Sequence, residues 1–166
     1  FDVTGMQPQV AKPHSPDNVV AIDTLKNVAI SQAYIGSCTG GKLADFIAAA
    51  QVMKGRKVTI PTFAVPATKE VFHHLITTQI GGVSVYQILT DAGVQLSSEA
   101  GCAACCGGPP DTFGRVHQPI SVIATTNRNF VGRMGHKRAS IYLASPYAVA
   151  AAAITGMITN PAELGV

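Results

Sequence analysis

Short apolar runs alternate with helical patterns along most of this chain. Five runs rich in β-branched and small residues predict strands at residues 28–35, 58–65, 94–96, 119–126 and 140–144. Capping residues and closing glycines around the other patterns predict helices at residues 43–53, 69–75, 83–92 and 146–155. Apolar strands that alternate with helices are typical of α/β proteins. We therefore expect three layers, a mostly parallel sheet with helices on both faces.

The first part of the chain has a different character. Residues 1–26 contain Pro8, Pro13 and Pro16 and show little periodicity, which predicts an extended arm or linker. Residues 27–166 are then expected to form a single α/β domain. Because the sequence starts at Phe1 without an initiator Met or a targeting leader, we expect it to be a fragment of a longer subunit.

Composition narrows the function classes. Hydrophobic residues make up 47% of the 166 positions and charged residues 13%, which favours a compact body over disorder. A net charge of +3 is too small and too scattered for a nucleic-acid surface, and it suits a small anionic ligand. The most apolar stretch, 141–158, is interrupted by Ser145, Pro146 and Gly156, so no membrane span is expected. The four cysteines do not resemble a disulfide framework, which favours a reducing compartment such as the cytoplasm.

Three cysteines, Cys38, Cys102 and Cys105, are the strongest chemical signal. Three thiolates without an obvious fourth would leave one iron of an iron-sulfur cube open, and an open iron can act as a Lewis acid. A Cys-x-x-Cys pair also occurs in redox dithiols and zinc sites, and buried cysteines are often inert. The glycines and prolines around this pair predict a loop, which disfavours a redox motif. Zinc would need a histidine as fourth ligand, and Cys106 would compete as a cluster ligand only if adjacent side chains faced the same way.

A second group of polar residues occupies positions 125–133. Arg128 and Arg133 can offer two forked sets of donors to the carboxylates of a diacid, with Asn127 as an additional donor. The alternative is a surface loop with solvated arginines. The cysteine segments and this loop all follow predicted strands, and the carboxyl ends of parallel strands share one edge of a sheet. We therefore expect both groups to line the same crevice.

Four ordered motifs resemble those of the aconitase superfamily, and most closely the large subunits of 3-isopropylmalate dehydratase. They are Ile-Gly-Ser-Cys-Thr at 35–39, Gly-Cys-Ala-Ala-Cys at 101–105, Asn-Arg-Asn-Phe-Val-Gly-Arg at 127–133 and Leu-Ala-Ser-Pro at 143–146. The segments 36–42, 61–68, 107–112 and 132–137 are similar to those of the plant-type and related prokaryotic members. The similarity extends from Gln9 to the end of the chain.

The resemblance implies a role for each matching residue. Cys38, Cys102 and Cys105 would hold a 4Fe-4S cluster. Asn127 would hydrogen-bond near it, and Arg128 and Arg133 would bind a substrate carboxylate. No catalytic acid or base of this chain is assigned, because such groups belong to the family's other domains. Two positions depart from the common pattern, since Gly40 replaces a frequent Asn and Cys106 a frequent Leu.

The function implied is that of a hydro-lyase domain, which dehydrates and rehydrates 2-isopropylmalate to 3-isopropylmalate. The alternatives are a dehydratase for homocitrate or a dimethylmalate, a metal-binding module without activity, and a structural domain with inert cysteines. The implied partners are the other domains of the large subunit, a small-subunit swivel domain and a small dicarboxylate or tricarboxylate. In a plant, the expected location is the plastid stroma. The isolated domain is expected to be inactive.

Overall fold

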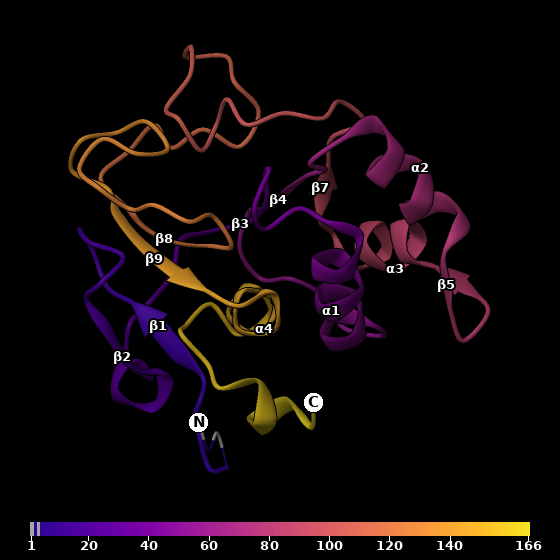
Figure 1. The fold of residues 1–166 in the computed structure, drawn as a ribbon, viewed down its shortest axis with the longest axis horizontal. Helices are drawn as coiled ribbons and strands as arrows, with labels where there is room; N and C mark the ends of the chain where they lie inside the picture. Colours follow the sequence, from indigo (N-terminus) through magenta and orange to yellow (C-terminus); the bar gives the residue numbers. More distant parts are fainter. Residues whose placement is uncertain (1, 3) are drawn as a thin grey trace.

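A seven-stranded mixed sheet forms the centre of the chain in this computed structural model, which describes residue 2 and residues 4–166 (Figure 1). The strand order is β2-β1-β9-β8-β3-β4-β7. The strands are β1 (Gln9–Ala11), β2 (Val19–Ala21), β3 (Gln32–Gly36), β4 (Thr62–Val65), β7 (Gln95–Leu96), β8 (Ser121–Ala124) and β9 (Ser140–Ala144). The five strands from β9 to β7 are mutually parallel, whereas β1 and β2 add to the edge antiparallel. The prediction of a mostly parallel sheet is confirmed.

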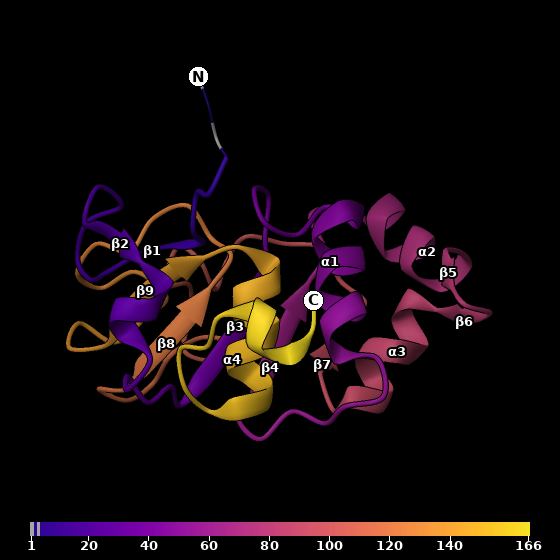
Figure 2. The same cartoon turned by 90° about the horizontal axis from the view of Figure 1, so that it is seen from below.

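Four helices lie on one side of this sheet, as Figure 2 shows from below. They are α1 (Leu43–Met53), α2 (Lys69–Thr77), α3 (Val85–Ala92) and α4 (Pro146–Thr155), accompanied by the hairpin β5 (Gln79–Ile80) and β6 (Val83–Ser84) and the short 3₁₀ helices η1 (Ile22–Leu25) and η2 (Pro161–Leu164). Helix α2 packs on α1 and α3. The expected caps are present: Thr68 accepts a hydrogen bond from the amide of Val71, and Gly93 and Gly156 end their helices in left-handed conformations. Among the described residues, no helix has the length and apolarity needed to cross a membrane.

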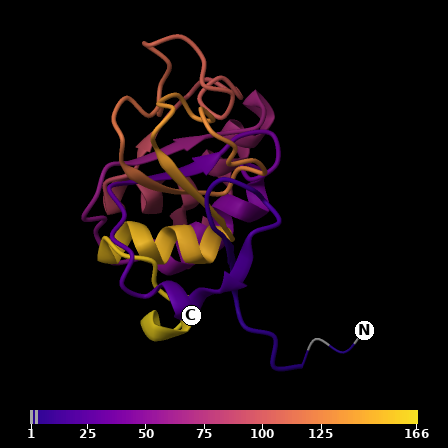
Figure 3. The same ribbon diagram turned by 90° about the vertical axis from the view of Figure 1, so that its left-hand side faces the viewer.

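The two faces of the sheet have different covers. Ala33 and Ile35 of β3 pack in the core beneath the helices, whereas Tyr34 between them belongs to a separate cluster on the opposite face. Figure 3 shows α4 on one side of the sheet and the irregular loops on the other. The third layer therefore consists of the loops 97–120 and 125–139, whereas helices were expected on both faces of the sheet. Their glycines and prolines prevent helix formation there.

The N-terminal segment is part of the sheet, which corrects the expected arm over residues 9–25. Val10 of β1 pairs with Ala144 of β9 and is fully buried, as is Ile22 of η1. The side-chain amide of Asn129 also donates to the carbonyl of Lys12 over 2.8 Å, which fastens this segment to the loop after β8. The strands β1 and β2 have three residues each, which is too short to show an alternation of apolar and polar positions. Their strand conformation is determined by the strand with which they pair and not by their own sequence.

Candidate functional site

The expected site residues follow the carboxyl ends of neighbouring parallel strands. The chain leaves β3 toward β4 and β7 on one side and later returns to β8 and β9 on the other, so the strand order reverses between β3 and β8. Ligands of open α/β sheets bind at such a reversal. Cys38 follows β3, the segment 102–106 follows β7, and the loop 127–133 follows β8. The sequence prediction that these segments share one edge of the sheet is confirmed.

Cys38 and Cys102 approach each other directly. Their Sγ atoms lie 3.9 Å apart, although they come from loops after different strands. The Cys102 thiol also donates to Ser37 Oγ over 3.5 Å. After deprotonation the Ser37 hydroxyl can donate back to the thiolate, and this hydrogen bond lowers the pKa of Cys102. Cys38 is exposed and Cys102 is half-buried, so both thiols are reachable from the loop side.

Cys105 lies deeper and has a different partner. Its side chain is buried, and its Sγ accepts a hydrogen bond from Arg133 Nη2 over 3.3 Å. Burial raises the pKa of Cys105, and the adjacent guanidinium opposes that shift. Arg133 Nε is buried without a hydrogen-bond partner, so this arginine keeps an unused donor beside the thiol. One expected metal ligand and one expected substrate ligand are therefore in contact.

The segment that carries Cys105 is a compact turn and not an extended loop. The amide of Cys106 donates to the carbonyls of Cys102 and Ala103, and Gly108 N donates to the carbonyl of Ala103 over 2.8 Å. The Cys106 side chain is exposed, whereas Cys105 is buried. The two adjacent thiols thus differ in burial, but the Cys106 side chain still lies close enough to Cys102 to lower its pKa by a hydrogen bond.

Thr125 connects the end of β8 to the loop that carries Cys38. Its Oγ1 accepts from the amide of Gly36 over 2.9 Å and lies 2.8 Å from the carbonyl oxygen of Gly40. A Cβ atom at Gly40 would lie only 2.1 Å from the carbonyl oxygen of Thr125. The position where many relatives of the resembled family carry Asn thus has no room for a side chain in this chain.

The remaining expected ligands, Asn127 and Arg128, are exposed on the loop after β8. Within the described part of the chain, neither side chain hydrogen-bonds to a cysteine. Asn129, in contrast, is fully buried, and its amide donates to the carbonyls of Lys12 and Ile141. Its role is to hold the loop in place, while its two neighbours are free to reach a ligand.

Four residues of the site were not singled out by their chemistry in the sequence. Ser37 and Thr125 contact the cysteine loops through their hydroxyls, and Arg115 Nε donates to the carbonyl of Gly108 over 2.8 Å. Tyr34, on the central strand, has a buried hydroxyl below the same loops. Ser37 belongs to the quoted motif at 35–39 and Thr125 begins the polar group at 125–133, and the sequence gives no other signal for either. Nothing in the sequence pattern distinguishes Tyr34 or Arg115.

The polar groups at this edge include four free thiols. Across residues 2 and 4–166, no three His, Cys, Asp or Glu side chains form a group arranged for one metal ion, and no histidine joins the thiols. The site nevertheless brings free thiols from two loops to one edge, and two buried donors near them, Tyr34 Oη and Arg133 Nε, lack acceptors. Sulfur acceptors placed among the cysteines would use such donors.

Comparison with known proteins decides the family. The model of the aconitase family (aconitate hydratase) matches residues 21–156. This chain belongs to the aconitase family.

Three relatives of this aconitase-family chain are named as large subunits of 3-isopropylmalate dehydratase. The chain is 50% identical to the chloroplastic 3-isopropylmalate dehydratase large subunit of Arabidopsis thaliana, over 98% of this chain and 33% of that protein. Identity to the 3-isopropylmalate dehydratase large subunit 1 of Methanopyrus kandleri is 42%, over 97% of this chain and 37% of the relative. The large subunit of Acetivibrio thermocellus is also 42% identical, over 99% and 38% respectively. The chain thus spans about a third of the length of these relatives.

Proposed function

We propose that this chain is the cluster-carrying domain of a 3-isopropylmalate dehydratase, a hydro-lyase that converts 2-isopropylmalate to 3-isopropylmalate. The observation that carries the proposal is that Cys38 contacts Cys102 and that Arg133 contacts Cys105, in loops at the same edge of the sheet. Family membership and relatives that share a single name over nearly the whole chain support the choice of substrate. Homocitrate and dimethylmalate are the alternative substrates within the same reaction class.

Cys38, Cys102 and Cys105 are the proposed ligands of a 4Fe-4S cluster. A cluster with three protein ligands supplies one iron with an open position, which polarises the hydroxyl of the substrate as a Lewis acid. The hydrogen bond with Ser37 lowers the pKa of Cys102, so this thiol loses its proton more easily when it binds the cluster. Cys105 has the opposite shift, since burial raises its pKa, and Arg133 compensates by placing a positive charge beside the sulfur.

Arg128, Arg133 and Asn127 are the proposed substrate ligands. The Arg128 guanidinium is exposed and free to form a forked contact with a carboxylate. Arg133 bridges the two parts of the site, because one nitrogen contacts Cys105 while Nε is buried without a partner. Both cations would stabilise negative charge that develops on the carboxylate in the transition state. The proton-transferring groups are assigned to other domains.

The length of the relatives supports further domains of a large subunit as partners, and the small subunit is part of the proposal alone. The remaining domains of a large subunit would cover the loop side of the sheet, and a small-subunit swivel domain would close over the substrate. The proposal includes the cytoplasm as location, or the plastid stroma in a plant, since the relative from Arabidopsis thaliana is chloroplastic.

The test uses the complete large subunit with its small subunit, after anaerobic reconstitution with iron and sulfide. We expect a broad visible absorbance band and turnover of 2-isopropylmalate at a higher kcat/KM than homocitrate or dimethylmalate. Cys38→Ser should remove both the band and the turnover. A colourless protein that binds one zinc ion tightly would contradict the cluster. A full cluster without turnover of any of the three acids would instead indicate a metal-binding module.

A further inference from the structure

Tyr34 carries a buried hydroxyl that has no hydrogen-bond partner. The residue lies in the middle of β3, with its side chain on the loop-covered face, and it is fully buried. Its Oη atom is also buried and unpaired. Buried tyrosines usually find a partner for the hydroxyl, because an unsatisfied polar group costs free energy in a dry environment. The missing acceptor therefore calls for an explanation.

The ring of Tyr34 is fixed in a narrow slot. A Cβ atom at Gly114 would lie 2.8 Å from Tyr34 Cε2, and one at Gly36 would lie 3.1 Å from Cε1. The absence of side chains at these two glycines is what makes room for the ring. Since backbone confines the ring on both sides, the hydroxyl cannot swing to a new partner elsewhere.

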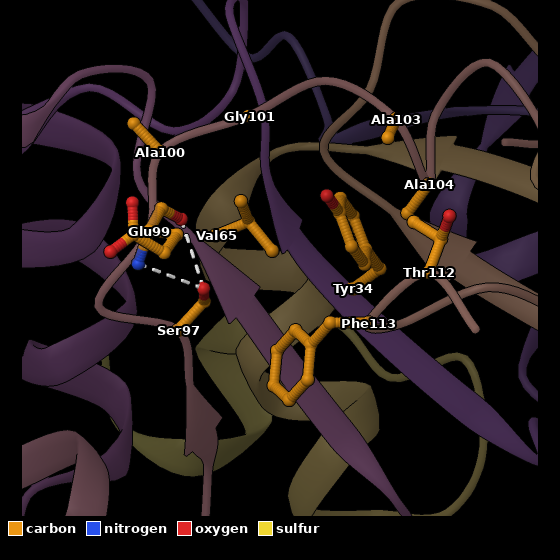
Figure 4. Close-up of a pocket in the computed structure, with 10 residues that line it drawn as sticks. All are labelled: Tyr34, Val65, Ser97, Glu99, Ala100, Gly101, Ala103, Ala104, Thr112 and Phe113. Carbon is orange, nitrogen blue, oxygen red and sulfur yellow. Dashed lines mark hydrogen bonds between the residues drawn. The ribbon is translucent and has the colours of Figure 1, made fainter. Parts of the chain in front are cut away.

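The hydroxyl points toward the cysteine loop. Figure 4 shows the Tyr34 side chain rising from β3 toward the segment with Ala103 and Ala104, two residues that stand between Cys102 and Cys105 in the sequence. Together with Val65 and Phe113 these residues line a cavity of about 170 Å³ between the sheet and the loop. The acceptor that the hydroxyl lacks would therefore be supplied from the side of Cys102 and Cys105.

The electrostatic environment keeps the Tyr34 hydroxyl protonated, so that it can donate a hydrogen bond. Burial, followed by the negative charge of the cysteine thiolates with Cys105 first, raises the pKa of Tyr34 well above its ordinary value. The phenol thus keeps its proton. A neutral O–H can donate a hydrogen bond to a sulfur atom.

We infer that Tyr34 is a positioning residue for the iron-sulfur group, to which its hydroxyl donates a hydrogen bond at a sulfur atom on the sheet side. The inference rests on the proposed function, because it requires that Cys38, Cys102 and Cys105 hold the cluster. Hydrogen bonds to sulfur favour the more reduced, more negative form of a cluster and raise its reduction potential. Tyr34 would therefore protect the cluster against oxidation and loss of iron.

The experiment compares the complete holoenzyme with its Tyr34→Phe variant. Phenylalanine fills the same slot and leaves all four thiols in place. Tyr142→Phe is the matched control, since Tyr142 is half-buried and packs against the helix-side core. Two quantities are measured. The first is the midpoint potential of the cluster, determined by electron paramagnetic resonance. The second is the rate at which ferricyanide converts the cluster to the three-iron form.

We expect a more negative potential and a several-fold faster loss of iron in Tyr34→Phe, with both values unchanged in Tyr142→Phe. Equal potentials and rates in the wild type and Tyr34→Phe, with full clusters in both, would overturn the inference but not the proposed function. The partner of the hydroxyl would then be a water molecule. A wild type that takes up no cluster would overturn the proposed function itself.

Discussion

The guanidinium of Arg133 donates a hydrogen bond to the thiol of Cys105 over 3.3 Å. The two residues come from different loops, one after β7 and one after β8, and they were expected to serve different ligands. Their contact means that a change at the arginine alters the environment of the buried sulfur as well. The proposed substrate recognition and the proposed cluster binding would therefore depend on each other.

Substitution of the two arginines should separate their roles. In the reconstituted complete enzyme, Arg128→Lys should lower kcat/KM by the equivalent of about 2 to 4 kcal/mol, because lysine loses the forked contact that strengthens in the transition state. Its cluster content should equal that of the wild type. Arg133→Lys should show a similar loss together with a less stable cluster, since it also changes the partner of Cys105. Steady-state kinetics and iron analysis provide the measurement, and near wild-type activity in both variants would remove them from the site.

The adjacent cysteines should respond differently to replacement. Cys105 is buried beside Arg133, whereas Cys106 is exposed. Cys105→Ser should lose the visible absorbance of the cluster, and Cys106→Leu should keep it. The reverse pattern would reassign the ligand, and mutual rescue of the two variants would show that the turn can exchange one thiol for the other.

The pKa of Cys102 can be tested by alkylation of the metal-free protein. Because the hydrogen bond with Ser37 lowers the pKa of Cys102, a larger thiolate fraction is present at pH 7 than in an ordinary cysteine. Ser37→Ala should raise the pKa and slow the reaction with iodoacetamide several-fold at pH 7. The difference between the wild type and Ser37→Ala should vanish above pH 10, where Cys102 is ionised in both proteins. Mass spectrometry of the 102–106 segment provides the rates, and Cys106 in the same peptide is the internal control. Equal rates at pH 7 would exclude the Ser37 effect.

Gly40 should resist even the smallest side chain. A methyl group there would meet the backbone of Thr125, so Gly40→Ala should destabilise the fold by about 1 to 3 kcal/mol through overpacking. Gly101→Ala is the control, because a Cβ atom at Gly101 meets nothing within 4 Å and its backbone is not left-handed. Urea denaturation of the metal-free protein measures both. A Gly40→Ala protein as stable as the control would show that the backbone around Thr125, at the end of β8, can shift to make room for a methyl group.

Removal of the unpaired phenol should strengthen the metal-free fold. Tyr34→Phe deletes a buried donor without an acceptor, so we expect the free energy of unfolding of the metal-free protein to rise by about 1 kcal/mol. The same urea experiment measures it. A decrease would indicate that the hydroxyl already has a partner, such as a buried water, when no cluster is bound.

Much of the architecture could be predicted from local chemistry. Helix α1 occupies the expected residues, and the caps Thr68, Gly93 and Gly156 act as expected, because these signals depend only on neighbours in the sequence. Strand β9 also has its expected bounds, whereas β3 starts four residues later than predicted, since apolar residues continue outside the hydrogen-bonded ladder. The hairpin β5–β6 was missed because its strands are two residues long.

The site was predictable in its location but not in its contacts. Parallel topology places the segments after the strands at one edge, so the neighbourhood of Cys38 and Cys102 follows from the order of strands and helices. The pairing of Arg133 with Cys105 depends on how two irregular loops fold over each other. The orientation of Tyr34 depends on the absence of side chains at Gly36 and Gly114, which are 78 positions apart. No local pattern reports such relationships.

The position of β3 between β8 and β4 has a consequence for how the protein is made. On the ribosome, Cys38 emerges early, but the strand that completes its surroundings begins only at Ser121, and Thr125 follows it. Contacts between segments so distant in sequence form late in folding. The pocket for the metal group can therefore close only when most of the domain has left the exit tunnel. Until then the free thiols stay accessible to oxidants and scavenging metals, so delivery of iron and sulfide is expected to follow synthesis and not accompany it.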